Sequence, residues 1–468
     1  MNENKMGTMS IPKLVLNVSV PIMLSMMVQS MYNIIDAVFV SQISEDAMSA
    51  VSLVGPMQNI MAATACGTAI AINAILSKSL GAKDTKNVTT IATHGMFLAF
   101  ISSAVFAVSV FVFAEPFYAM QVATDSTIYA YCLDYQIVIC VFSLGLFGQT
   151  MTERLLQASG KTSLSMLTQM VGALVNIILD PLLIHGYWIF PKLEVKGAAI
   201  ATVIGQTVAF LLALWIQKRY NKEIVINFSK FKPSFTLIKK IYAIAVPSIL
   251  NLSVASVAGY FLNNFVLSYS SSALATYGIC EKIRSFFFMP IGGLNSGLIP
   301  IMAYNYGAGN KKRVLNSLYF GMAVSLGLLV LGALAFVFLP TQMLSIFNAS
   351  ENMLSIGVPM MRAYAIYFMP VLFGYLFNSI AQGLGKSYYA LIVSLVKQSS
   401  IIPIAYLLVT YGTMNQFWYS QFWSEIVTML AVFVCFALLY RGVIVHIGSE
   451  NSSEVKAVQK NKKRKIKT

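Results

Sequence analysis

Residues 171–186, VGALVNIILDPLLIHG, are an apolar stretch interrupted by an amide, a carboxylate and a proline. Asn176 and Asp180 are four residues apart, so both lie on one face of a helix. Pro181 removes a backbone donor and loosens or kinks the helix there. A carboxylate in a long apolar helix is expensive to bury, so it usually faces a cavity or a partner and marks an ion or proton path. The stretch indicates a polar, titratable pocket in a membrane bundle; the alternative is a polar pair that only joins neighbouring helices.

The composition assigns the whole chain to the membrane. Of 468 residues, 57% are hydrophobic and 10% are charged, whereas a soluble domain carries about 25% charged residues. A spanning helix needs about 20 apolar residues. Because no small-residue cleavage site follows a short apolar core, we expect no cleavable signal peptide and interpret the first apolar run as a spanning helix. Apolar runs of spanning length lie at roughly residues 14–40, 48–77, 88–113, 127–156, 164–186, 197–217, 235–268, 273–304, 314–339, 353–384, 387–411 and 416–440. We therefore expect an all-α polytopic membrane protein with about twelve transmembrane helices.

Composition also argues against several other classes of site. The five cysteines lie in apolar runs without a CxxC pair, and the three histidines are scattered, so neither a metal site nor a disulfide framework is expected. No nucleophile, metal or phosphate motif near an interface suggests an enzyme acting on lipid. The net charge of +15 would suggest nucleic acid for a soluble protein, but here it lies mostly in short loops and the tail. We expect no enzyme activity, no nucleic-acid partner and no organic cofactor.

The distribution of lysine and arginine predicts the orientation. Basic residues occur in the loops at residues 78–86, 161, 218–232, 311–313 and 386, whereas the loops at residues 41–47, 114–126, 269–272 and 340–352 contain none. The turn near Pro191 is an exception, with Lys192 and Lys196 beside Glu194. The positive-inside rule then places both termini in the cytoplasm. Residues 442–468, which end in NKKRKIKT, are interpreted as a basic cytoplasmic tail near anionic lipid.

The chain repeats itself at an offset of about 226 residues. Pro21 and Gly81 recur as Pro247 and Gly307, and QASGKTS at 157–163 recurs as QGLGKSY at 382–388. Matched order and equal spacing predict two six-helix halves of the same orientation, related by an axis along the membrane normal. The predicted divisions are a first lobe at 1–217, a cytoplasmic linker at 218–234 and a second lobe at 235–441. The substrate path is then expected between the lobes near the midplane.

Four polar residues of the first half are candidates for an ion-coupling site. Asp36 lies in MYNIIDAVFVSQ, and Thr202 follows GAAIA in the sixth run. With Asn176 and Asp180 they could converge in one cavity. Two close carboxylates cannot both stay ionised cheaply, so one would hold a proton; a sodium site is the alternative if oxygens close around an ion. For Thr202 alone, a hydrogen bond to its own backbone is the competing interpretation.

Candidate substrate residues form a polar face in the first run. Asn33 and Tyr32 lie one turn before Asp36, and Gln29 lies two turns before it. Their spacing places them on one side of the helix. We expect these side chains to line the path.

Two further acids are candidates with open alternatives. Glu153 and Arg154 precede a cytoplasmic turn, where lipid contact or a gating ion pair competes with substrate contact. Glu281, in ICEKIRSFFFMP, shares a helix face with Arg284. Glu281 either attracts a cationic substrate or forms an internal ion pair with Arg284.

The chain resembles the multidrug and toxic compound extrusion (MATE) family, and more closely its DinF-like and Mep-type prokaryotic branch. The resemblance covers roughly residues 10–445. It is carried by the paired halves, the GAK turn at 81–83, QASGKTS, NIILDPLLIHG at 176–186 and VKGAAIATVIGQ at 195–206.

This resemblance implies a V-shaped pair of six-helix lobes in the cell membrane and cation-coupled export of organic, often cationic, drugs. It implies that Asp36, Asn176, Asp180 and Thr202 form the coupling site. Another branch uses acids in the seventh and tenth helices for sodium, but residues 246–265 contain no acid and the tenth run offers only an amide, Asn378. We therefore expect proton coupling rather than sodium coupling. Small organic cations and the bilayer are the expected partners of a monomer, and a flippase for a lipid-linked precursor is the alternative function.

Overall fold

The computed structural model describes residues 4–187, 189–229, 231–347 and 350–448, and it contains helices and no strand within these ranges. In chain order the helices are α1 (Lys5–Thr8), α2 (Ile11–Ser41), α3 (Glu45–Gly81), α4 (Thr85–Ala119), α5 (Thr127–Val141), α6 (Leu144–Ala158), α7 (Thr162–His185), α8 (Glu194–Tyr220), α9 (Phe235–Leu267), α10 (Ser271–Gly307), α11 (Lys311–Phe338), α12 (Pro340–Ser345), α13 (Glu351–Gly383), α14 (Ser387–Tyr411), α15 (Met414–Phe417), α16 (Ser420–Gly442) and the 3-10 helix η1 (Ile444–His446). Most of the predicted basic tail, residues 449–468, lies outside the described residues.

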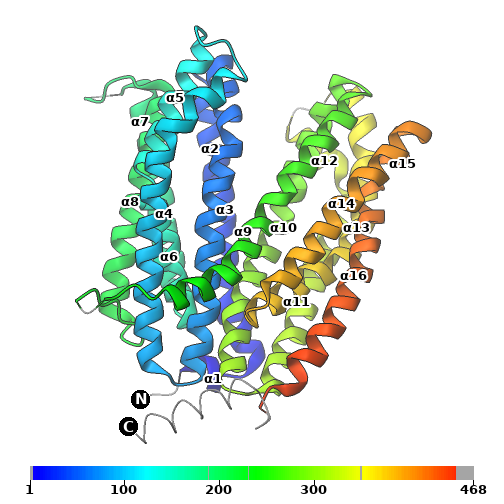
Figure 1. The fold of residues 1–468 in the computed structure, drawn as a ribbon. Coiled ribbons are helices and arrows are strands. Elements are labelled where there is room, and N and C mark those ends of the chain that lie inside the picture. The colour runs from blue at the N-terminus through cyan, green and yellow to red at the C-terminus, as the bar shows by residue number, and fades with distance from the viewer. Residues whose placement is uncertain (1–3, 188, 230, 348–349, 449–468) are drawn as a thin grey trace, which may run out of the picture.

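The helices form a V with two arms, one of α2–α8 and one of α9–α16 (Figure 1). The arms meet at the end that holds α1 and spread apart at the end that holds α5, α12 and α15. Eleven of the described helices are long and apolar enough to span a membrane, and the number rises to twelve if the bent pair α5 and α6 forms one span. The predicted polytopic, two-lobed helical fold is confirmed.

The fourth predicted run, expected as one helix over 127–156, is instead broken into α5 and α6. The two pieces are bent by 46°. Ser143 and Gly145 lie at the break, and such pairs are a common cause of sharp kinks. The hydroxyl of Ser143 lies 3.1 Å from that of Ser103 on α4, so the break is fixed by a neighbouring helix.

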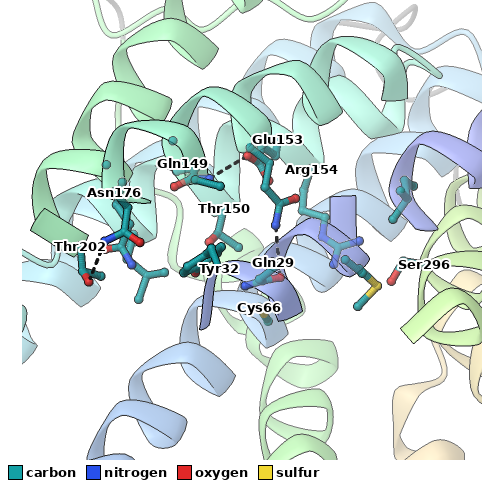
Figure 2. Close-up of a pocket in the computed structure, with 18 of the residues that line it drawn as sticks. Gln29, Tyr32, Cys66, Gln149, Thr150, Glu153, Arg154, Asn176, Thr202 and Ser296 are labelled. Carbon is teal, nitrogen blue, oxygen red and sulfur yellow. Dashed lines mark hydrogen bonds between the residues drawn. The ribbon is translucent and has the colours of Figure 1, made fainter. Parts of the chain in front are cut away.

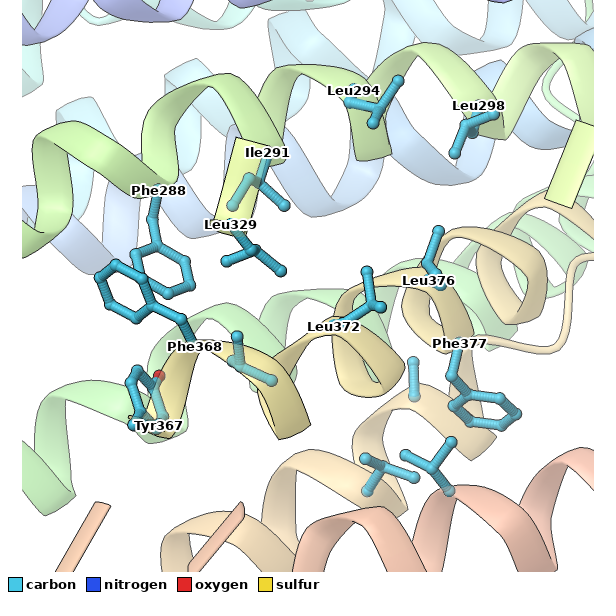
Figure 3. Packing of buried hydrophobic residues seen from close by; sticks show 14 of the residues in the cluster. Phe288, Ile291, Leu294, Leu298, Leu329, Tyr367, Phe368, Leu372, Leu376 and Phe377 are labelled. Carbon is cyan, nitrogen blue, oxygen red and sulfur yellow. The ribbon is translucent and has the colours of Figure 1, made fainter. Parts of the chain in front are cut away.

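Helix α2 belongs to both arms. Its first turns carry Leu14 and Val18, which are fully buried in the same apolar cluster as Leu294 and Leu298 of α10. Figure 3 shows this cluster where α10 faces α13. Since lipid is as apolar as leucine, helices in a membrane associate by close packing rather than by the hydrophobic effect. The small residues of α10 permit such packing: a Cβ at Gly293 would lie 2.5 Å from the Cα of Met23 on α2.

At the base of the V, α3 and α10 touch through the two glycines that the repeat relates. A Cβ at Gly81 would lie 1.9 Å from the carbonyl oxygen of Tyr304, and a Cβ at Gly307 would lie 1.9 Å from that of Lys78. Such distances are impossible for a real side chain, so only glycine allows this backbone contact at either position. The internal repeat thus produces a symmetric contact that joins the arms.

The N-terminal segment, residues 4–9 with α1, lies at the same base and forms hydrogen bonds with both arms. From the second arm, Arg313 Nη2 and Asn305 Nδ2 donate to the carbonyl oxygen of Met6 at 3.1 and 3.2 Å. From the segment, Asn4 Nδ2 donates to the carbonyl oxygen of Ser159 in the first arm at 3.4 Å. Met6 is fully buried. The segment therefore fastens the two arms where they meet.

Candidate functional site

The four predicted coupling residues lie together in the first arm. Asn176 Nδ2 donates to Asp180 Oδ1 at 3.2 Å. The same nitrogen lies 3.4 Å from Thr202 Oγ1 (Figure 2). Asp36 of α2 lies within hydrogen-bonding reach of Asp180 on α7. Asp180 is fully buried and Asn176 is 3% exposed. The structure thus brings together residues from α2, α7 and α8 that are up to 166 positions apart in the chain.

Close packing of α7 on α8 explains why Thr202 reaches this cluster. A Cβ at Gly205 would lie 2.7 Å from the carbonyl oxygen of Gly172. The glycines let the two backbones approach, and Thr202 lies one turn before Gly205 on the same side of α8. Pro181, which was expected to loosen or kink this stretch, lies inside α7, and the helix continues past it to His185.

This cluster has more hydrogen-bond acceptors than donors. Three of its buried oxygens, Asp36 Oδ1, Asn176 Oδ1 and Asp180 Oδ2, have no partner among the described residues. A buried oxygen without a hydrogen-bond partner is costly and needs a physical explanation, such as a bound proton, ion or water molecule. The oxygen set fits a proton or a hard cation such as sodium, whereas no group of three or more His, Cys, Asp and Glu side chains suitable for another metal occurs in the described ranges.

Beside the cluster lies a cavity of about 140 Å³. It is lined by five of the predicted site residues: Gln29, Tyr32, Glu153, Asn176 and Thr202. Asn33 is exposed and does not line this cavity. Drug-sized ligands occupy pockets of about 300–1,000 Å³, so this first-arm cavity holds only a small group in this conformation.

Glu153 and Arg154 point to different partners within that cavity. Glu153 Oε1 accepts from Gln149 Nε2 at 2.9 Å and from Thr168 Oγ1 at 3.1 Å. Arg154 Nη1 donates to Gln157 Oε1 at 2.9 Å. Glu153 is 9% exposed and is the only acidic side chain lining this cavity within the described part of the chain.

Glu281 lies apart from these residues, in a second cavity of about 540 Å³. Both oxygens of Glu281 accept from Arg284, and Tyr364 donates to Glu281 Oε1 at 2.7 Å. This arrangement is the internal ion pair that the sequence left as an alternative. A contact between Glu281 and substrate stays a prediction.

A second ion pair in this cavity was not predicted from the sequence. Lys397 of α14 pairs with Glu425 of α16. Each is an isolated charge inside an apolar run, and a buried charge needs a partner. From this requirement the sequence could predict that each charge has a partner. It could not predict which of the several isolated charges pair with each other.

The two cavities adjoin one another and share lining residues from both arms. Met26, Cys66, Arg154 and Ser296 line both. Together the cavities connect the buried acid cluster of the first arm with the ion pairs of the second. A two-armed membrane bundle that holds a buried, unsatisfied carboxylate pair beside internal cavities defines a membrane transporter.

Comparison with known proteins agrees with this class. The MatE family model matches residues 21–182 and 247–407, and the chain belongs to the MatE family. The two matched segments lie in the two arms of the V. The family consists of transporters, so the chain is not an enzyme, and the predicted family is confirmed.

Several relatives are similar over most of their length. The chain is 25% identical over 435 residues to the multidrug export protein MepA of Staphylococcus haemolyticus, covering 92% of this chain and 95% of that protein. It is also 25% identical over 360 residues to a FAD transporter of Shewanella oneidensis, covering 75% and 78% of the two chains. These names agree with the predicted Mep-type branch.

Solved structures share the fold. A multidrug resistance MATE family transporter in an outward-facing conformation superposes with a TM-score of 0.87 at 22% identity, covering 96% of this chain and 99% of that one. A MOP superfamily transporter from Pyrococcus furiosus superposes with a TM-score of 0.86 at the same identity and coverage. The likeness confirms the V-shaped transporter fold.

Proposed function

We propose that this protein is a secondary active multidrug exporter of the cell membrane, working as a monomer by antiport against protons and alternating access. The observation that carries the proposal is the Asp36–Asp180 pair, in which each carboxylate has one buried oxygen without a partner among the described residues. The relatives named for multidrug export support the substrate class. The lysine and arginine distribution supports an orientation with both termini in the cytoplasm.

Protons fit the cluster better than sodium. Two facing carboxylates in an apolar bundle repel one another when both are ionised, and a single shared proton removes that repulsion. In the second arm, Asn251 of α9 donates to Asn378 Oδ1 of α13 at 3.2 Å. Two amides therefore bond to each other where the sodium-using branch is expected to have acids. Within the described parts of both arms, no closed shell of charged oxygens is available for sodium.

Helix α2 supplies the mechanical link between proton binding and the arms. The C-terminal part of α2 carries Asp36, whereas Leu14 and Val18 near its N-terminal end are buried in the core of the second arm. Pro21 lies between them and weakens the helix locally. Protonation of the acid pair lets α2 and α7 repack, and this shift reaches the second arm through α2. Export is coupled because the protonated and drug-bound forms prefer different arrangements of the arms.

Within the first-arm cavity, Glu153 with Tyr32 and Gln29 forms the proposed contact for a cationic group. The carboxylate of Glu153 provides the charge, and Tyr32 provides an aromatic face. The cavity must enlarge to admit a drug, which agrees with a site that changes volume between conformations.

Transport into proteoliposomes tests the proposal, with proton and sodium gradients imposed separately. Asp36→Asn and Asp180→Asn should each abolish proton-driven uptake of an organic cation while the protein stays folded. Asp125→Asn, a change of the same type on an exposed residue, is the matched control and should transport normally. Wild-type transport rates in both cluster variants would refute the coupling site. Uptake driven only by a sodium gradient would refute proton coupling. Movement of lipid-linked precursors without drug transport would favour the flippase alternative.

A further inference from the structure

The larger cavity has an excess of positive charge. Its lining contains three basic side chains, Arg154, Arg284 and Lys397, and two acidic ones, Glu281 and Glu425. Its volume of about 540 Å³ lies within the range of drug-sized sites. A cavity built only for organic cations would be expected to carry the opposite excess.

The Lys397–Glu425 pair presents its positive end to the cavity. The side chain of Lys397 is 23% exposed, whereas that of Glu425 is 2% exposed. The carboxylate therefore lies behind the ammonium group and holds it in place. An ammonium group has three N–H donors, and Glu425 and Tyr367 occupy two of them.

Arg284 contacts the same hydroxyl group of Tyr367 as Lys397 does. Its Nε and Nη2 donate to Glu281, whereas its Nη1 lies 3.4 Å from the hydroxyl oxygen of Tyr367. The guanidinium carbon lies 5.7 Å from the ring centroid of Phe288 and 5.8 Å from that of Tyr364. These aromatic faces help to position the guanidinium group, whose charge is paired with that of Glu281.

Tyr367 is the point where the two cations converge. Lys397 Nζ lies 3.5 Å from its hydroxyl oxygen, and Arg284 Nη1 lies 3.4 Å from the same oxygen. Both contacts are long for hydrogen bonds and therefore weak. Tyr367 is 2% exposed, and the described residues offer no acceptor for its hydroxyl hydrogen. Two cations, each paired with a carboxylate, thus converge with one O–H donor that has no acceptor among the described residues.

We propose that Arg284, Lys397 and Tyr367 form an anion-binding subsite that takes the carboxylate or phosphate group of an organic compound. The anionic oxygens would replace the weak contacts at Tyr367 with charge-assisted hydrogen bonds, which are shorter and stronger than neutral ones. Tyr277 and Tyr375 line the same cavity and provide aromatic surface for the body of the compound.

Arg154 extends this preference toward the first arm. Its guanidinium forms no ion pair among the described residues and bonds to a neutral amide. It lies where the two cavities adjoin. An acidic compound entering the larger cavity therefore meets an unpaired cation as well as the subsite itself. The proposal rests on the proposed exporter function. It specifies that compounds with an acidic group are among the exported substrates.

Dye binding to the purified protein tests the subsite without requiring transport. Rhodamine B carries a free carboxylate, and its ethyl ester has the same ring system without that charge. We expect fluorescence anisotropy to show about tenfold tighter binding of the free acid, the difference that about 1.4 kcal/mol of added hydrogen bonding produces. Equal affinity of the wild-type protein for both dyes would refute the proposal.

Two variants assign the preference to the subsite. Tyr367→Phe should reduce the preference for the acid several-fold, and Lys397→Gln/Glu425→Gln should remove most of it without leaving an unpaired charge. The matched control is Lys196→Gln/Asp134→Asn, which removes an exposed ion pair elsewhere in the chain and should leave the preference unchanged. A preference that survives in the Lys397 double variant would overturn the assignment.

The same assay separates this proposal from the exporter proposal. Asp36→Asn should retain the acid preference because Asp36 does not line the larger cavity. Gradient-driven export without an acid preference would eliminate the subsite alone. An acid preference without gradient-driven export would support the subsite and eliminate the exporter.

Discussion

Replacing Gly81 by alanine should shift the protein away from the conformation seen here. The new Cβ would lie 1.9 Å from the carbonyl oxygen of Tyr304 and 2.8 Å from its carbonyl carbon. Because real Cβ atoms essentially never come closer than 3.0 Å to a neighbour, α3 and α10 must separate by roughly 1 Å. Overpacking of this kind typically costs about 1–3 kcal/mol. Both atoms are backbone, so no side chain can rotate away.

That cost applies to the closed base and therefore to one state of the exporter proposed above. In the other state the arms separate at the base and approach at the spread end, which relieves the clash. A bias of about 1–3 kcal/mol changes the ratio of two states by roughly 5- to 150-fold. Gly307→Ala should act in the same way, because its Cβ would meet the carbonyl oxygen of Lys78 at the same distance.

Pulsed electron paramagnetic resonance measures this shift. Spin labels at Asp125 and Gln342, two exposed positions at the spread ends of the arms, should give a shorter mean distance in Gly81→Ala than in the wild type. Gly55→Ala is the matched control on the same helix, since its Cβ would meet nothing within 4 Å. An unchanged distance distribution in folded Gly81→Ala protein would show that the glycine contact does not control the base.

Three other predictions address stability and topology. Lys397→Gln alone should lower the free energy of unfolding by about 3–5 kcal/mol because it leaves the buried carboxylate of Glu425 unpaired. In thermal melting, Lys397→Gln/Glu425→Gln should recover most of that loss. Equal losses in the two variants would contradict the pairing. Arg313→Gln removes a donor to the carbonyl oxygen of Met6, so a cysteine at position 6 should react faster with a thiol reagent, and an unchanged rate would show that the segment is held by other contacts. A cysteine at Asp125 should react with an impermeant reagent on intact cells, and protection there combined with labelling in inverted vesicles would reverse the orientation.

The sequence was informative where the relevant spacing is local or repeated. Asn176 and Asp180 are one helical turn apart, so their shared face could be read directly, and the repeat of Gly81 as Gly307 pointed to paired halves. A helix that is apolar on all sides does not show which face is buried. For that reason the exposure of Asn33, which directly follows the cavity-lining Tyr32 in the chain, could not be predicted.

Other features depended on packing between distant segments. The pairing of Lys397 with Glu425 joins α14 to α16, and neither residue has a local pattern that names its partner. The break between α5 and α6 depends on Ser143 meeting Ser103 across 40 positions. Composition predicts that such helices span the membrane, but it carries no information on which lone polar residues meet inside it.

The fastening of the N-terminal segment has a consequence for biogenesis. Met6 is made early, yet the donors to its carbonyl oxygen, Asn305 and Arg313, lie 299 and 307 positions later in the chain. At about 5–20 residues per second, the ribosome needs roughly 15–60 s to cover that interval. Ser159, the partner of Asn4 in the first arm, is made 155 positions after it, whereas the partners in the second arm are still missing when this first contact can form. The segment's final hydrogen bonds therefore form only after α10 and α11 have been inserted, which makes closure of the base a late step in assembly.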